Sequence, residues 1–407
     1  MAPALESCLR PPGAVSAASG QAGERAATVN VTPLAAHGPR AFGPTSTELL
    51  GKLRLGWNLG NSLDAPDGEA AWGNPQATPE LFATVAKLGF RAVRIPVTWS
   101  PQTGPGPAFT IESSWLERVG EVVSYAHAAG LYAVINVHHD GADGFKGPEW
   151  LTLNDAQGRT TEANNASVRA RFVAVWRQIA GYFSQHGEEL LFESMNEIHD
   201  GYGDPDPRHM AFINDLNQHF VDLVRTSGGN NAQRHLIVPG YNTNIDHTVA
   251  GFTPPQDPTP GRLALSVHYY DPYTFALVAK TKTWGAASPG HDAWGQEAHV
   301  TTQFDKLKTR FIDQGLPVFL GEYGATHQAG FEDYRRYYVE YVTKAAVERG
   351  ILPVYWDNGG HNDGGESFAL FDRSSGQVLH PELLQAMRRA ADGSGKLDDI
   401  ALPQPNR

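Results

Sequence analysis

The feature that most constrains the fold is an alternation of short apolar runs with longer segments of helical periodicity, which starts near residue 45 and continues almost to the end of the chain. Runs typical of buried strands lie within 51–58, near 190, and at 92–97, 131–137, 235–239, 263–267, 317–321 and 351–355. Helical patterns lie at 78–88, 115–129, 168–183, 208–226, 298–313, 331–348 and 381–391, and the fifth helix is weakly marked. Eight alternating units predict an α/β fold in which a parallel sheet closes as a single (β/α)8 TIM barrel.

Both ends of the chain differ in character from this alternating part. Residues 1–44 are rich in Ala, Gly, Pro and Ser and have weak periodicity, which predicts a flexible leader or linker. We therefore expect a barrel domain over 45–395 and a tail over 396–407. A signal peptide needs a basic start and a continuous apolar core, and neither is present, so secretion cannot be inferred from this terminus.

Charge and cysteine content narrow the possible partners. The chain carries 32 Lys and Arg against 44 Asp and Glu, a formal net charge of −12, which disfavours nucleic acid and anionic membranes as partners. A neutral ligand is easier to accommodate. The single cysteine, Cys8, allows neither an intrachain disulfide nor a cysteine-based zinc site. No apolar stretch approaches the length of a membrane span.

Two of the predicted strands run directly into a glutamate. The stretch LLFESMNE ends at Glu197, and the run that begins at Pro317 leads into Glu322. The two glutamates are 322 − 197 = 125 residues apart in the sequence, so only a fold that gathers strand ends could bring them together. A barrel does this at the carboxyl ends of its strands, and we therefore expect both carboxylates in one site.

The other predicted strand ends add a polar and aromatic set of side chains. This set consists of Asn61, Asp64, Arg94, His138, Asn196, His268, Tyr270 and Trp356. Paired carboxylates without a nucleophilic Ser or Cys, a Gly-rich phosphate loop or a compact metal cluster favour acid/base hydrolysis of an acetal. The longest connection, about 271–296, carries Trp284 and Trp294, and long loops on a barrel rim are usually functional.

Simpler explanations exist for several of these residues. Arg94 could neutralise a buried carboxylate, and Trp356 could belong to the core. The sequence His138-His139-Asp140 could bind a metal. However, adjacent histidines on a strand point to opposite faces, and no third ligand is evident at a fixed spacing. We therefore expect no metal and no cofactor, and expect these side chains to hydrogen-bond a substrate.

Seven motifs together resemble a known family. They are GWNLGNSLDA (56–65), RIPVTW (94–99), INVHHD (135–140), SMNE (194–197), VHYY (267–270), GEYG (321–324) and YWDN (355–358). With them, roughly residues 50–390 resemble bacterial cellulase-type members of glycoside hydrolase family 5, a clan of retaining (β/α)8 enzymes. One departure is Ile198-His199, where many relatives have Pro after the acid, which leaves the leaving-group side of the site undefined.

The resemblance implies a role for each site residue. Glu197 is implied as acid/base and Glu322 as nucleophile. The residues implied to line the subsite of the attacked sugar are Arg94, His138, Asn196, His268, Tyr270 and Trp356. The positions implied to contact the next sugar outward are Asn61, Asp64 and His139.

A retaining mechanism places further demands on these groups. Glu197 must first be protonated, and we expect the nearby charge of Glu322 to raise the pKa of Glu197. Arg94 and Tyr270 are expected to keep Glu322 ionised. Asn196 is expected to bond the sugar 2-hydroxyl, and Trp356 to offer a flat platform for a sugar ring.

The predicted function is that of a retaining endo-β-1,4-glucanase acting by double displacement on cellulose, mixed-linkage glucan or xyloglucan. A β-mannanase with the same machinery is the alternative within the family. A barrel that binds polysaccharide without cleaving it is a rival from another class, and a phosphate-using barrel enzyme fits less well. We expect a monomer whose only partner is the glucan. The family resemblance implies an extracellular location.

Overall fold

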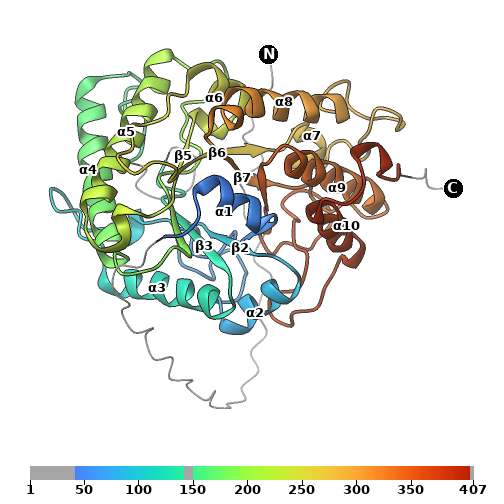
Figure 1. Cartoon of the computed structure of the whole chain (residues 1–407), viewed down its shortest axis with the longest axis horizontal. Coiled ribbons are helices and arrows are strands. Elements are labelled where there is room, and N and C mark those ends of the chain that lie inside the picture. Colours follow the sequence, from blue (N-terminus) through green and yellow to red (C-terminus); the bar gives the residue numbers. More distant parts are fainter. Residues whose placement is uncertain (1–41, 142–149, 404–407) are drawn as a thin grey trace, which may run out of the picture.

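The computed structural model describes residues 42–141 and 150–403, and these form a closed barrel of eight parallel strands in chain order (Figure 1). The strands are β1 Gly56–Asn58, β2 Ala92–Ile95, β3 Tyr132–Asn136, β4 Leu190–Glu193, β5 Leu236–Pro239, β6 Leu263–Tyr269, β7 Val318–Tyr323 and β8 Leu352–Tyr355. Nearly all strand residues are buried, as expected where helices cover the outside of a barrel and side chains fill its interior. The predicted (β/α)8 barrel is confirmed.

The helices that surround the barrel follow the predicted order. They are α2 Pro79–Lys87, α3 Ser113–Ala128, α4 Glu162–Tyr182, α5 Pro207–Thr226, α6 Ile245–Gly251, α8 Glu297–Arg310, α9 Glu332–Glu348 and α10 Pro381–Asp392. The helix after the fifth strand, α6, has only seven residues, which explains its weak sequence pattern. No helix among the described residues has both the length and the apolar character needed to span a membrane.

The first strand is shorter than predicted because a helix precedes it. The prediction placed the first strand within 51–58, whereas helix α1 spans Ser46–Leu53 and β1 contains only three residues. Thr45 and Glu48 form a capping box that starts α1. Leu49, Leu50 and Leu53 of α1 pack into a cluster with residues of seven barrel strands. The helix therefore closes one end of the barrel.

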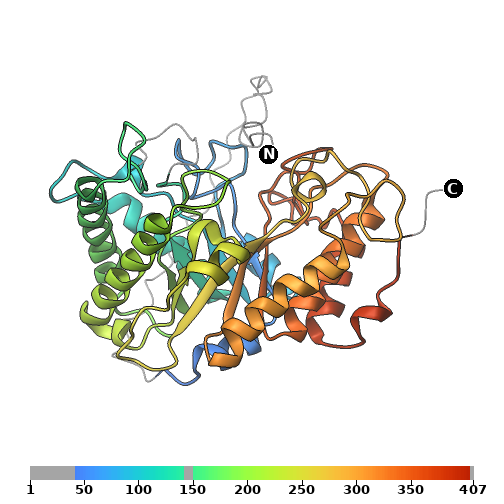
Figure 2. The same cartoon turned by 90° about the horizontal axis from the view of Figure 1, so that it is seen from above.

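The two ends of the barrel differ. In Figure 2 the blue helix α1 lies at the lower end of the barrel, and long connecting loops gather at the upper end. This upper end holds the carboxyl ends of the strands, where barrel enzymes carry their active sites. Stability elements and candidate functional elements are thus separated along the barrel axis.

The segments outside the barrel core are described only in part. Of the leader predicted over 1–44, residues 1–41 lie outside the described part of the chain. Phe42 is buried, and its carbonyl oxygen accepts a hydrogen bond from Arg262 at 2.8 Å. In the tail predicted over 396–407, a short helical turn spans Leu397–Asp399.

The two tryptophans of the long connection after β6 do not line the active-site cleft described below. Helix α7 (Tyr273–Ala276) forms the start of this connection. Trp284 is fully buried against tyrosines of α9, and its indole N–H donates to the Gly295 carbonyl at 2.8 Å. Trp294 is 45% exposed and packs edge-on against His299. Trp284 therefore serves packing rather than substrate contact.

Candidate active site

A buried arginine organises the floor of the site. Arg94 lies on β2, is fully buried, and donates hydrogen bonds of 2.7 Å to Glu193, Glu322 and Asn196. Burial lowers the pKa of Arg94, but the charges of Glu193 and Glu322 raise it by more, so the net pKa lies above its ordinary range. The guanidinium stays charged and hydrogen-bonds side chains from β4, from the loop that follows β4 and from β7, which fixes them relative to one another. Arg94 therefore does neutralise a buried carboxylate, Glu193, and at the same time fixes Glu322.

The two predicted glutamates meet across His268. The Nδ1 of His268 lies 2.5 Å from Oε1 of Glu197 and 3.7 Å from Oε2 of Glu322. Tyr270 donates its hydroxyl hydrogen to Oε2 of Glu322 at 3.1 Å. One carboxylate oxygen of Glu197 and one of Glu322 lie within 4.8 Å of each other. The carboxylates are therefore close enough to act on one bond.

The pKa of Glu197 differs from the expectation. We expected the charge of Glu322 to raise it, but the net pKa of Glu197 lies below its ordinary range. Burial does raise this pKa, while the charge and the hydrogen bond of His268, together with the charges of His199 and Arg94, lower it by more. The expectation was wrong because it considered only the two carboxylates and omitted the imidazole between them. His268 thus favours the ionised form of Glu197.

The hydrogen bonds around His138 fix its tautomer. The side-chain oxygen of Asn136 accepts from the Val97 N–H at 3.2 Å, so the amide NH2 of Asn136 must face the imidazole. This NH2 lies 3.1 Å from Nδ1 of His138 and 2.9 Å from Glu193. Because Nδ1 accepts, the neutral ring carries its proton on Nε2. The pKa of His138 lies well below its ordinary range, mainly because of burial, so the ring stays neutral.

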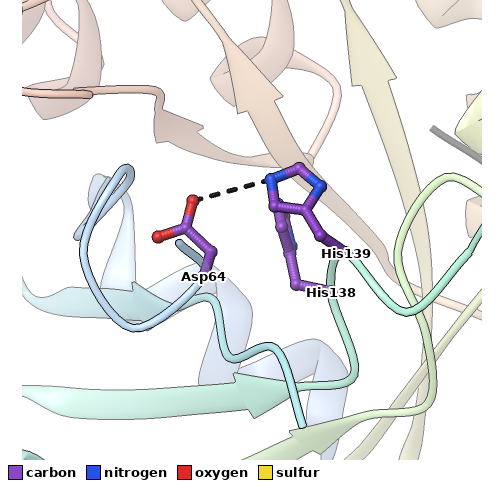
Figure 3. A group of neighbouring side chains, drawn as sticks. All are labelled: Asp64, His138 and His139. Atoms are coloured by element: carbon purple, nitrogen blue, oxygen red, sulfur yellow. Dashed lines mark ion pairs between the residues drawn. The ribbon is translucent and has the colours of Figure 1, made fainter. Parts of the chain in front are cut away.

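Asp64, His138 and His139 lie together, contrary to the expectation that the histidines face opposite ways (Figure 3). The two imidazole rings are 4.4 Å apart between centroids, and Nε2 of His139 lies 3.8 Å from Oδ2 of Asp64. The alternation rule fails here because β3 ends at Asn136, before the pair. Both oxygens of Asp64 accept backbone N–H groups, from Asn61 at 2.9 Å and Ser62 at 2.6 Å. The carboxylate of Asp64 therefore already has hydrogen-bond partners within the protein.

A cleft of about 720 Å³ lies at the carboxyl ends of the strands. Most of the predicted site residues line it, namely Asn61, His138, His139, Asn196, Glu197, His268, Tyr270, Glu322 and Trp356. Asp64 and Arg94 do not line the cleft and are fully buried. The Trp356 ring is nearly parallel to that of His138, with 6.0 Å between centroids and 6° between planes. The structure thus brings together side chains from the ends of six different strands or their following loops.

Many lining residues escaped the sequence-based prediction, among them Trp72, Tyr202, Thr243 and Glu366. None of these four lies directly at a strand end, which was the signal used. A backbone signal does mark part of the cleft, because Asn61, Asn242, Thr243 and Glu366 all have positive φ angles between 47° and 61°. Such conformations are costly for residues other than Gly and concentrate at functional sites.

Comparison with known proteins agrees with this geometry. The family model named Cellulase (glycosyl hydrolase family 5) matches residues 58–362. Endoglucanase A of Paenibacillus barcinonensis is 39% identical over 367 residues, which cover 84% of this chain and 89% of the relative.

Solved structures show the same relationship. A GH5-4 broad specificity endoglucanase from Bacteroides salanitronis is 44% identical, with a TM-score of 0.80, and the match covers 90% of this chain and 99% of that one. A family 5 xyloglucanase from Paenibacillus pabuli, solved in complex with ligand, is 40% identical, with a TM-score of 0.79 and coverage of 84% and 99%. The chain therefore belongs to the cellulase family of glycoside hydrolases, glycosyl hydrolase family 5.

Proposed function

We propose that the protein is a retaining endo-β-1,4-glucanase in which Glu322 is the nucleophile and Glu197 the acid/base. The observation that carries this proposal is the approach of the two carboxylate oxygens to within 4.8 Å. Retaining glycosidases hold their carboxyl groups about 5–5.5 Å apart, whereas inverting enzymes need roughly 6.5–9.5 Å to admit a water molecule. The spacing therefore supports double displacement over a single displacement.

The reaction proceeds in two balanced steps. In the first step, an oxygen of Glu322 attacks the anomeric carbon, the glycosidic C–O bond breaks, and Glu197 gives its proton to the departing sugar oxygen. In the second step, Glu197 takes a proton from water, and the resulting hydroxide displaces Glu322 from the anomeric carbon. Each glutamate returns to its starting state. Glu197 must therefore hold a proton before the first step.

The surrounding contacts support this division of labour. Arg94 and Tyr270 each hydrogen-bond one oxygen of Glu322, which keeps the nucleophile ionised and oriented. Asn196 accepts from Arg94 through its side-chain oxygen, so its NH2 group is available to bond the sugar 2-hydroxyl. His138 presents an Nε2–H donor, and Trp356 offers an aromatic face to a sugar ring.

The remaining predicted residues act around the next sugar outward. Asn61 and His139 line the cleft and can contact a sugar directly. Asp64 is buried beneath them and accepts the backbone N–H of Asn61, so its proposed role is to hold this side of the cleft in place.

The proposed substrates are β-1,4-linked glucans, namely cellulose, mixed-linkage glucan and xyloglucan. Two relatives at 44% and 40% identity are named a broad specificity endoglucanase and a xyloglucanase, which supports a glucan backbone and tolerance of side chains. A β-glucan is uncharged, so a protein with a formal net charge of −12 does not repel it. The partner is thus a polysaccharide or an oligosaccharide derived from it.

Domain organisation, assembly and location complete the proposal. Helices α1 and α10 bound the barrel at Ser46 and Asp392, which supports a catalytic domain over 45–395 flanked by a leader (1–44) and a tail (396–407). We propose a monomer, because the described part of the chain exposes few large apolar side chains, namely Tyr182, Tyr202, Trp294 and Leu402. We propose an extracellular location, because polysaccharides are too large to enter cells intact. Sedimentation and cell fractionation test these two points.

The central experiment compares Glu322→Gln and Glu197→Gln with the wild-type enzyme on a panel of glucans and mannan. We expect Glu322→Gln to lower kcat by roughly 10⁴-fold or more while the melting temperature stays near that of the wild type. Glu332→Gln, which changes a carboxylate of α9 outside the cleft, is the matched control. An active Glu322→Gln enzyme would refute the nucleophile assignment. Faster release of reducing ends from mannan than from glucan would establish a β-mannanase, and binding without cleavage would establish a non-catalytic barrel.

A further inference from the structure

A further carboxyl group, besides those of Glu197 and Glu322, lines the cleft from the loop between β8 and α10. Glu366 is partly exposed and lines the same cavity as Glu322, His139 and Trp356. The NH2 group of Asn358 donates to Oε2 of Glu366 at 3.1 Å and to the carbonyl oxygen of Glu366 at 3.0 Å. No hydrogen bond to Oε1 comes from any described residue, so this oxygen is open to a ligand.

The backbone holds Glu366 in a conformation that costs free energy. Its φ angle is +61°, in the left-handed region that residues other than Gly rarely adopt. The loop folds back tightly here, because a Cβ at Gly360 would lie 2.1 Å from the carbonyl oxygen of Glu366. The side-chain oxygen of Asn358 accepts from the N–H groups of Gly360 and Phe368 and so ties both sides of the loop together. The surroundings thus impose this conformation, as is common where a side chain contacts a ligand.

The titratable groups near Glu366 indicate on which side of the cleaved bond this residue lies. Burial raises the pKa of Glu366 to about 7; the Asn358 hydrogen bond and His139 oppose this rise, and the charge of Glu322 adds to it. The pKa of Tyr270 lies above its ordinary range, first because of burial and the charge of Glu322, and the charge of Glu366 adds to this rise. The titratable groups that interact with Glu366 are therefore Glu322 on β7, His139 after β3 and Tyr270 after β6. In the proposed mechanism Glu322 attacks the anomeric carbon, which belongs to the sugar on the nonreducing side of the cleaved bond, and His139 contacts the next sugar outward on that side.

We propose that Glu366 contacts the substrate on this nonreducing side and accepts a hydrogen bond from a sugar hydroxyl through Oε1. The inference rests on the proposed glucanase function and adds a specificity-determining residue to it. A carboxylate bonds a hydroxyl more strongly than a neutral acceptor does, because the bond is charge-assisted. Substrate affinity is therefore expected to increase as Glu366 ionises, which takes place around neutral pH.

The test compares Glu366→Gln with the wild type from pH 5.5 to 8.5 on a soluble glucan. The amide keeps the shape and the bond from Asn358 but cannot ionise. We expect KM at pH 8 to rise about three- to tenfold with a smaller change in kcat, as for the loss of one charge-assisted bond. When the wild-type kcat/KM is divided by that of the variant, the effects of ionisations that both enzymes share cancel. We expect this ratio to rise as the pH increases through about 7. A ratio that stays at one across this range would overturn the proposal.

Two controls keep the result specific. Asp363→Asn removes a carboxylate from the same loop that bonds the Ala329 N–H and does not line the cleft, so its KM should match that of the wild type. Glu366→Asp keeps an ionisable group but shortens its reach, so its KM should rise, as in the glutamine variant. Calorimetric binding of cellotetraose distinguishes the two proposals. A wild-type enzyme that neither binds nor cleaves glucan would refute both, whereas an active enzyme unaffected by Glu366→Gln would refute this one alone.

Discussion

Among the neighbours of Glu197, His268 has the largest effect on the pKa of this carboxylate. Burial raises this pKa, but the charge and the hydrogen bond of His268, which lies 2.5 Å away, together with the charges of His199 and Arg94, lower it by more, so the pKa of Glu197 lies below its ordinary range. The proposed acid step requires Glu197 to be protonated, and activity must fall as pH rises through the pKa of that group. The alkaline limb of the pH profile therefore reports on the His268 contact.

Replacing His268 with Asn should move this limb. Without the imidazole, the pKa of Glu197 rises, Glu197 holds its proton to higher pH, and the alkaline limb of kcat/KM shifts upward, although overall activity falls. His219→Asn, which changes a partly exposed histidine of α5, is expected to leave the limb in place. Profiles measured from pH 4 to 10 check the prediction. A limb that stays fixed or moves downward in His268→Asn would show that another group acts as the acid.

Single residues also show where sequence reasoning stops. Motifs at strand ends predicted that Glu197 and Glu322 would meet, because the barrel dictates where strands end. The same reasoning was wrong for the direction of His139, since the chain has already left β3 at that point. It could not locate Glu366, whose placement depends on hydrogen bonds from Asn358 across a loop. Contacts made through space after a strand ends depend on tertiary packing that the local sequence does not encode.

At the scale of elements, a glycine lets the first strand approach the last one. Gly60 follows β1, and a Cβ there would lie 2.8 Å from two ring atoms of Trp356 and 2.9 Å from the Asp357 carbonyl oxygen. Gly60→Ala should therefore displace the proposed sugar platform, raise KM and lower the free energy of unfolding by about 1–3 kcal/mol. Urea denaturation and steady-state kinetics measure the two effects.

The matched control for this change lies in α1. A Cβ at Gly51 would have no atom within 4 Å, and the residue is inside a helix, so Gly51→Ala should stabilise the protein by roughly 0.5–1 kcal/mol. An unchanged KM in Gly60→Ala would indicate that the Trp356 ring yields without affecting substrate binding.

Some helices and strands were easier to predict from the sequence than others, for a clear physical reason. Buried parallel strands such as β4 and β7 begin with three consecutive apolar residues and are easily recognised. Helix α1 was missed because Leu53, Leu55 and Trp57 alternate in the way that a strand does, and all three are buried. The capping box of Thr45 and Glu48 was the available sequence signal for a helix start.

For the whole molecule, the alternation of eight strand–helix units in the sequence predicted the closed barrel. Closure of the barrel brings the carboxyl ends of the strands together and so accounts for the active site. The barrel also separates catalysis from stabilisation, because the cleft lies at one end and the leucines of α1 fill the other. A change at the α1 end should therefore alter stability without altering catalysis, as is general for barrel enzymes.

Leu50→Ala tests this separation. Leu50 is 2% exposed and packs into the end of the barrel, so its truncation leaves a cavity and should lower the free energy of unfolding by about 2–5 kcal/mol. At 25 °C, where the variant remains folded, kcat/KM on glucan should equal that of the wild type. Lys52→Ala, an exposed change on the same helix, should leave both quantities unchanged. A fall in kcat/KM of Leu50→Ala under folded conditions would instead mean that packing at the closed end of the barrel is transmitted along the strands to Glu197 and Glu322.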